Sequence, residues 1–294
     1  MHSHSQYTAK QVIQEAEYAA AYHWSKRKRL EWTRYWRLTN LLADLISGID
    51  SVRARSSVSI CDFGCGDGRG SYELWQILNS RGFKTSLVGV DRSQDAIAWA
   101  KAKTGSKPSD SHSSADTGGG RVLSQAADTD GAPQARPDGG CLSFRVADID
   151  EALRALPDDG SPPVVVMREV IEHLSEDEID TVLTTIRRRA PSACLLVTTP
   201  STNSPVEAKH FRHYTPESLS LTMERNSFAV TRMLGYAFRP SALFRPLQRA
   251  KGILDRLPLL WRLMNVAWRT VPPGVAITLV CMAAPSVPAG SQRA

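Results

Sequence analysis

The sequence lacks a long apolar run, a signal-peptide core and any paired-cysteine motif. Its longest apolar stretch, VAITLVCMAA at 275–284, is too short to cross a bilayer. The first twenty residues contain no apolar core of the kind that directs secretion. The five cysteines form no C-x-x-C pair, and three of them stand in apolar runs typical of buried strands. Together these absences predict reduced thiols and a cytoplasmic location.

The composition is that of a globular chain with a modest basic excess. Of the 294 residues, 42% are hydrophobic and 22% are charged, and the formal net charge is +6. Such a chain is long enough to bury a sizeable core. The positive charge suits an anionic partner, such as a nucleic acid, a phosphorylated substrate or an acidic membrane surface, without choosing among them.

Strands and helices alternate along most of the chain. VSICDFGCG at 58–66 predicts a strand that runs into a glycine turn, and TSLVGVD at 85–91 predicts a second strand. Apolar runs at 228–236 and 275–284 predict two closing strands. This alternation predicts an α/β fold with a seven-stranded, mostly parallel sheet and helices on both faces. Ligands of such sheets bind at the carboxyl ends of the strands.

Three segments stand outside this alternation. Residues 1–50 predict an N-terminal helical lid ahead of a domain at 51–294. Residues 104–140 are rich in Ser, Gly, Asp and Pro, which predicts a disordered insertion. Residues 239–273 mix basic residues with leucine and tryptophan, which predicts a helical insertion. We rank a pocket lid first for this insertion, peripheral contact with the inner face of the membrane second, and RNA binding third.

The glycine loop DFGCGDG at 62–68 does not fit the common phosphate-binding patterns. The dinucleotide fingerprint G-x-G-x-x-G fails because Arg69 and Ser71 stand where a third glycine is required. No Lys-Ser or Lys-Thr follows the loop, so the pattern G-x-x-x-x-G-K-[ST] fails as well. A nicotinamide oxidoreductase is therefore a weaker hypothesis.

A second pattern, D-x-G-x-G-x-G with carboxylates after later strands, fits better. Gly64, Gly66 and Gly68 let the backbone approach a ligand without a Cβ clash. Asp91 ends the second predicted strand, where a carboxylate accepts hydrogen bonds from ribose hydroxyls. Asp148 ends the third predicted strand, where a carboxylate accepts from an adenine amine.

DFGCGDG, together with VGVD, VADID and EVIEHL, resembles class I S-adenosylmethionine-dependent methyltransferases over residues 55–235. The resemblance implies a Rossmann-like fold, S-adenosylmethionine (SAM) as cofactor and methyl transfer as activity. Asp62, before the first glycine, is then expected to order the loop or to meet the ammonium group of SAM. The positions expected to bind SAM are Asp62, Gly64, Cys65, Gly66, Gly68, Asp91, Arg92, Asp148, Ile149 and Glu169.

Titratable residues follow the fourth and fifth predicted strands. Glu169, Glu172 and His173 are spaced i, i+3 and i+4, so they share one face if a helix begins there. KHFRHYT at 209–215 brings His210, Arg212 and His213 to the same end, and we expect His210 and Arg212 to be catalytic residues as well. Methyl transfer to a hydroxyl needs in-line positioning and removal of a proton. We expect His173 to act as the base, with Glu172 orienting its ring and favouring its charged form.

The acceptor separates the remaining hypotheses. E-V-x-E-H with H-x-R-x-x-T resembles ubiquinone-biosynthesis-like O-methyltransferases and many bacterial methyltransferases near glycan, lipid and natural-product pathways, which implies a small-molecule, glycan or lipid-precursor acceptor. A divalent metal is possible in this hypothesis but is not favoured. EVIEH also resembles metal-dependent small-RNA 3′-terminal 2′-O-methyltransferases, which implies a divalent metal on Glu169, Glu172, His173 and His210. We favour the first hypothesis, so nucleic acid is not the expected partner. A protein that binds SAM without catalysis is a further alternative.

Overall fold

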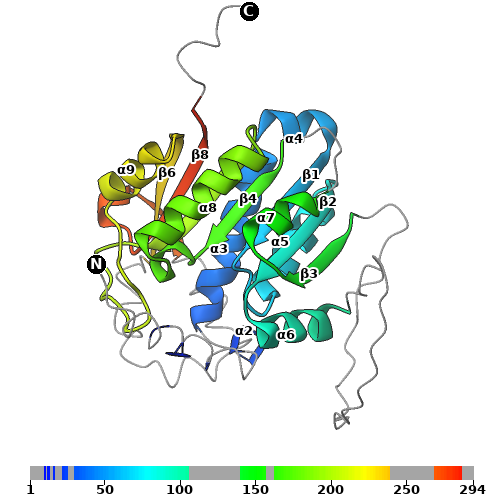
Figure 1. Cartoon of the computed structure of the whole chain (residues 1–294), viewed down its shortest axis with the longest axis horizontal. Coiled ribbons are helices and arrows are strands. Elements are labelled where there is room, and N and C mark those ends of the chain that lie inside the picture. The colour runs from blue at the N-terminus through cyan, green and yellow to red at the C-terminus, as the bar shows by residue number, and fades with distance from the viewer. Residues whose placement is uncertain are drawn as a thin grey trace, which may run out of the picture.

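One eight-stranded sheet organises the chain (Figure 1). The computed structural model describes residues 10, 12–13, 16, 22–25, 30–105, 140–156, 162–238 and 268–286. The strands are β1 (Ser57–Phe63), β2 (Lys84–Asp91), β3 (Leu142–Val146), β4 (Val164–Arg168), β5 (Cys194–Pro200), β6 (Phe228–Phe238), β7 (Trp268–Val271) and β8 (Thr278–Pro285). The helices are α2 (Tyr22–Ser25), α3 (Leu30–Ser47), α4 (Asp50–Arg55), α5 (Arg69–Ser80), α6 (Gln94–Thr104), α7 (Ile149–Arg154), α8 (Glu176–Arg189) and α9 (Pro216–Arg225), with 3-10 turns η1 (Ile171–His173) and η4 (Pro273–Val275).

The strand order is β3-β2-β1-β4-β5-β8-β6-β7. Neighbours from β3 to β5 pair in parallel, whereas β8, β6 and β7 join through antiparallel pairs. The chain order reverses between β1 and β4, which is the point where open α/β sheets bind ligands. The predicted glycine turn follows β1, and EVIEH follows β4, so both lie beside this point.

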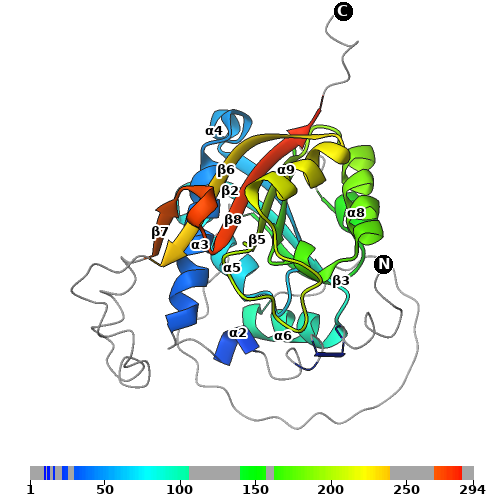
Figure 2. The same cartoon turned by 90° about the vertical axis from the view of Figure 1, so that its left-hand side faces the viewer.

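Helices cover both faces of the sheet (Figure 2). Helices α7, α8 and α9 lie on one face, and α3, α4 and α5 lie on the other. Alternate side chains of each strand serve the two faces, because successive Cβ atoms point in opposite directions. In β4, Val165 and Met167 join the core under α7–α9, whereas Val164 and Val166 join the core under α3–α5.

Side-chain caps place the helices that border the site. Ser175 Oγ accepts from the Glu178 backbone N–H at 3.3 Å, and the Glu178 carboxylate accepts from the Ser175 N–H at 2.8 Å, at the start of α8. Thr215 caps α9, with Ser218 as its reciprocal partner. None of the described helices is both long and apolar enough to cross a bilayer.

The mixed α/β sheet is confirmed, with two differences from the predicted elements. The sheet has eight described strands and not seven, because the short strand β7 pairs with β6. Residues 268–271, predicted as part of a helical insertion, form β7. The described residues leave out 239–267 of that insertion and 106–139 of the predicted disordered insertion. The assignment of 1–50 as a lid stays a prediction.

Candidate functional site

A cavity of about 1100 Å³ extends along the carboxyl ends of the parallel strands. One end is formed by the glycine loop after β1 and by the residues that follow β2 and β3. The other end is formed by η1 and by the loop that precedes α9. His23, Arg34 and Tyr35 of the N-terminal helices close one side. The volume slightly exceeds the roughly 300–1,000 Å³ that is typical of a small-molecule site.

Asp91 ties the glycine loop to the end of β2. Its Oδ2 accepts from the Gly66 N–H at 2.9 Å, and its Oδ1 accepts from the Ser93 N–H at 2.9 Å. Burial raises the pKa of Asp91 above its usual value, while these two backbone hydrogen bonds act in the opposite direction. Because a carboxylate has about four lone-pair sites, Asp91 retains acceptor capacity towards the cavity that it lines.

The three loop glycines have different roles. All three have positive φ, at 71° for Gly64, 56° for Gly66 and 73° for Gly68. Gly64, Cys65 and Gly66 line the cavity, whereas Gly68 does not. A Cβ on Gly68 would lie 2.5 Å from the Cβ of Ala100, so this glycine permits α5 to start against α6. Gly68 therefore serves packing, and the expected contact of Gly68 with a cofactor is not supported by the geometry.

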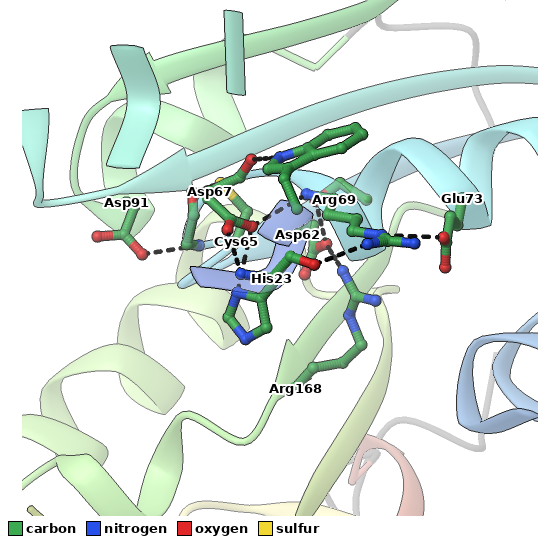
Figure 3. A network of polar contacts seen from close by, with 11 residues as sticks. His23, Asp62, Cys65, Asp67, Arg69, Glu73, Asp91 and Arg168 are labelled. Atoms are coloured by element: carbon green, nitrogen blue, oxygen red, sulfur yellow. Dashed lines mark hydrogen bonds and ion pairs between the residues drawn. The ribbon is translucent and has the colours of Figure 1, made fainter. Parts of the chain in front are cut away.

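Asp62 lies beneath the loop and not on the cavity. Its Oδ2 accepts from Arg168 Nη2 at 2.5 Å and from Ser71 Oγ at 2.6 Å (Figure 3). Its Oδ1 is buried without a hydrogen-bond partner in the described part of the chain. Of the two roles expected for Asp62, the geometry supports ordering of the loop. Arg168, which the sequence did not single out, is the member of this pair that lines the cavity.

The N-terminal clasp, formed by His23, Trp24, Asp67 and Arg69, holds α2 against the glycine loop (Figure 3). The Asp67 carboxylate accepts from the His23 backbone N–H at 2.9 Å and pairs with its Nδ1 at 3.2 Å. Trp24 Nε1 donates to the Asp67 carbonyl at 2.8 Å, and Arg69 Nη1 donates to the His23 carbonyl at 2.7 Å. The sequence predicted a lid at the N-terminus but no role for Asp67. Arg69 entered the sequence predictions only because it stands where a dinucleotide fingerprint requires glycine.

Asp148 stands two residues beyond the end of β3 and caps α7. Its Oδ1 accepts from the Glu151 N–H at 2.9 Å. The prediction that Asp148 ends a strand is therefore wrong, because the strand stops at Val146 and the carboxylate is used as a helix cap. Asp148 nevertheless lines the cavity, as do Ile149 and Arg92.

The histidine cluster, formed by Glu172, His173 and His210, lies at the other end of the cavity. One potential ligand atom from each residue lies within 4.8 Å of the other two. The two imidazole rings meet edge to face, with centroids 4.6 Å apart. The Phe211 N–H donates to the Glu172 carbonyl at 2.7 Å, which holds the His210 loop against η1. Glu172 Oε1 and His173 Nδ1 are buried without partners among the described residues.

Burial determines the charges of this cluster. It raises the pKa of Glu172 well above the usual range, with the nearby Glu169 charge acting in the same direction. It lowers the pKa of His173 to about 3, with His210 as the next cause. The pKa of His210 is also lowered to about 3, first by burial and then by His213. The expectation that Glu172 favours the charged form of His173 is therefore wrong: both imidazoles are neutral near pH 7.

Glu169 and Arg212 do not join this cluster. Glu169 precedes η1 with a φ of 54°, so it does not share a helix face with Glu172 and His173 as predicted. Its Oε2 accepts from Arg34 Nη2 at 2.9 Å, although Glu169 still lines the cavity. Arg212, an expected catalytic residue, pairs with Glu176 at 2.8 Å and is not among the residues that line the cavity.

Comparison with known proteins agrees with this architecture. No curated protein matches the sequence significantly. The structure of magnesium protoporphyrin IX methyltransferase from Synechocystis PCC 6803 with bound SAM is similar over 94% of this chain and 97% of that chain, with 11% identity and a TM-score of 0.52. A SAM-dependent methyltransferase from Methanosarcina mazei is similar over 79% and 94%, with 14% identity and a TM-score of 0.45. Residues 33–233, more than half of the chain, match the methyltransferase domain family, and the protein therefore belongs to that family.

Proposed function

We propose that this methyltransferase moves a methyl group from SAM to a hydroxyl oxygen of a small molecule, a glycan or a lipid precursor. One observation carries the proposal: a single cavity joins the glycine loop and its carboxylates to two neutral imidazoles. A methyltransferase needs such continuity, because donor and acceptor must meet in line.

The glycine-loop end fits the cofactor. Gly64 and Gly66 let the backbone approach a nucleoside closely. Asp91 retains acceptor capacity for the ribose hydroxyls besides its hydrogen bonds from the Gly66 and Ser93 N–H groups. Asp148 presents a carboxylate on the same wall, suited to the adenine amine. SAM would supply an electrophilic methyl group in this half of the cavity.

The histidine-cluster end fits the acceptor. A neutral imidazole accepts a hydrogen bond from a hydroxyl and thereby orients its oxygen. His173 and His210 both present rings to the cavity from loops that backbone hydrogen bonds fix to each other. The low pKa of His173 makes full protonation of its buried ring costly. His173 is thus suited to hold the acceptor by accepting a hydrogen bond. It can act as a base only if neighbouring groups stabilise its protonated ring.

A divalent metal on Glu172, His173 and His210 is a second candidate, favoured by the convergence of three ligand atoms within 4.8 Å. The residues fit a divalent metal, because imidazoles bind metals in the neutral form. A metal would also give a partner to Glu172 Oε1 and His173 Nδ1, which are buried without a hydrogen bond among the described residues. A bound metal would lower the pKa of an acceptor hydroxyl. The 3′ end of an RNA, with two adjacent hydroxyls, is the acceptor that this variant of the proposal implies.

Calorimetric titration with SAM tests the cofactor end. Asp91→Ala is expected to weaken SAM binding by about 1.5–3 kcal/mol, the range for a lost hydrogen bond to a charged group. Asp95→Ala, an exposed carboxylate on α6 outside the cavity, is the matched control and should bind SAM normally. Equal affinities for the two variants would show that Asp91 does not contact the cofactor.

Methyl transfer from labelled SAM into glycan, quinone and RNA pools tests the reaction. Label in a small-molecule, glycan or lipid product, lost with His173→Ala, supports the favoured proposal. Activity that disappears after exhaustive chelation and returns with a divalent metal supports the metal variant. Full activity in chelator excludes the metal, and label confined to RNA 3′ ends excludes the small-molecule acceptor. Tight SAM binding without transfer to any pool supports a non-catalytic SAM-binding protein.

A further inference from the structure

A chain of hydrogen bonds runs from His210 to the backbone of the preceding loop. His210 Nδ1 lies 2.8 Å from His213 Nε2, and His213 Nδ1 lies 3.0 Å from the Ser204 carbonyl oxygen. His210 is only 5% exposed, and its ring meets that of His173 in the histidine cluster. His213 is half-buried and lines the same cavity, yet it belongs neither to the cofactor end nor to the cluster.

The direction of these bonds follows from the chemistry of the groups. A carbonyl oxygen can only accept, so His213 Nδ1 carries a hydrogen. In neutral His213 the other nitrogen, Nε2, is then an acceptor. His210 Nδ1 must therefore donate to it, and the single hydrogen of neutral His210 is used in this bond. The Nε2 of His210 is left with a lone pair.

We propose that His213 is a positioning residue that holds His210 in the tautomer with hydrogen on Nδ1, so that the Nε2 lone pair is available to the site. This inference rests on the proposed function, in which His210 contacts the acceptor hydroxyl or a metal. Either use requires an acceptor nitrogen, and a hydrogen on Nε2 would block both. Lys10 supports the same loop by donating to the His210 carbonyl at 2.5 Å.

Burial supports the neutral state that this argument requires. His210 is 5% exposed, and burial disfavours the charged form of an imidazole. The tautomer of His210 is then decided by its Nδ1 partner, His213.

Nitrogen-15 NMR of histidine-labelled full-length protein at about pH 8 tests the tautomer without an acceptor. His210 is expected to show a protonated Nδ1 and an unprotonated Nε2, and His213→Phe is expected to change this pattern. A wild-type His210 with hydrogen on Nε2 would overturn the proposal, whatever the activity of the enzyme. Failure of methyl transfer with the expected tautomer would overturn the proposed function instead.

Kinetics separate positioning from mere structural support. His213→Phe should lower kcat by about 10–100-fold, the range for removing the partner of a functional imidazole, while the affinity for SAM stays unchanged. His213→Gln should restore part of kcat, because a carboxamide retains one acceptor and a donor. Val206→Ala, at an exposed position of the same loop outside the cavity, is the control. Equal losses in the Phe and Gln variants at equal thermal stability would contradict a positioning role.

Discussion

Gly64 and Gly82 both adopt positive φ, at 71° and 88°, but their surroundings differ. A Cβ on Gly64 would lie 2.6 Å from Val170 Cγ2, whereas a Cβ on Gly82 would meet nothing within 4 Å. Val170 stands between β4 and η1, so Gly64 permits the glycine loop to pass close to the segment that carries the histidine cluster. The lack of a side chain at Gly64 is therefore what allows the glycine loop and Val170 to approach this closely.

Alanine at these two glycines separates backbone strain from steric contact. Gly82→Ala should cost roughly 1–2 kcal/mol of unfolding free energy, because an L-residue with a Cβ pays for the left-handed region. Gly64→Ala should cost about 1–3 kcal/mol more, since the added methyl also overpacks against Val170. Urea unfolding of the two variants measures the difference. Equal losses would mean that the loop and Val170 move apart freely.

At the scale of elements, the N-terminal clasp joins α2 to the turn that connects β1 with α5. Asp67 is 1% exposed and receives hydrogen bonds from both His23 and Arg69. Burial alone would raise its pKa, but the hydrogen bonds and charge of His23, together with backbone N–H groups, lower it below the usual value. The clasp therefore depends on an ionised Asp67.

Acid should weaken this clasp. Because the pKa of Asp67 is lower in the folded state, the unfolded chain binds the proton first as the pH falls below about 4. The stability that Asp67 contributes is complete above that pH and is lost as the pH falls through the folded-state pKa. Between about pH 5 and pH 3, Asp67→Asn should therefore lose less unfolding free energy than the wild type.

Chemical unfolding across this pH range measures the effect, with Asp44→Asn as the control. Asp44 pairs with Arg81 at 2.8 Å, but its side chain is 64% exposed, so its contribution to stability is small. A wild type and an Asp67→Asn variant with parallel pH profiles would show that the ionised form of Asp67 does not support the clasp.

At the scale of the whole molecule, one sheet carries two cores and one continuous cavity. The helices on each face bury opposite sides of the same strands, and the cavity lies where the loops after β1, β2, β3, β4 and β5 meet. A ligand in this cavity contacts segments far apart in the chain. Binding should therefore stabilise the folded state as a unit and not merely order one loop.

S-adenosylhomocysteine should raise the thermal stability of the protein, and NAD should not. At about 100 times its dissociation constant, a ligand that binds only the native state adds about 2.7 kcal/mol to the unfolding free energy. Differential scanning calorimetry at matched ligand concentrations measures the shift. Stabilisation by NAD alone would favour the oxidoreductase that Arg69 and Ser71 argue against.

The sheet, the glycine loop and the position of Asp91 could be predicted because each rests on local patterns. Period-two apolar runs, helical periodicity and a glycine turn are properties of neighbouring residues, so they are legible in the sequence. Sequence patterns predicted the role of a residue less well where that residue can serve two structural purposes. Asp148 caps a helix and does not end a strand, and the chain after β4 forms a 3-10 turn in place of the α-helix that the E-x-x-E-H spacing favours.

The convergence of the site is decided by tertiary structure. Glu172 and His173 lie in η1, which follows β4, and His210 lies in the loop after β5. They meet because β4 and β5 are parallel neighbours whose carboxyl ends share one edge. The same packing removes water from His173 and His210 and lowers the pKa of both imidazoles, an effect of burial that local sequence patterns do not reveal. Residue identity therefore determined which chemistry is available, and the fold determined which groups meet, in which protonation state and around which cavity.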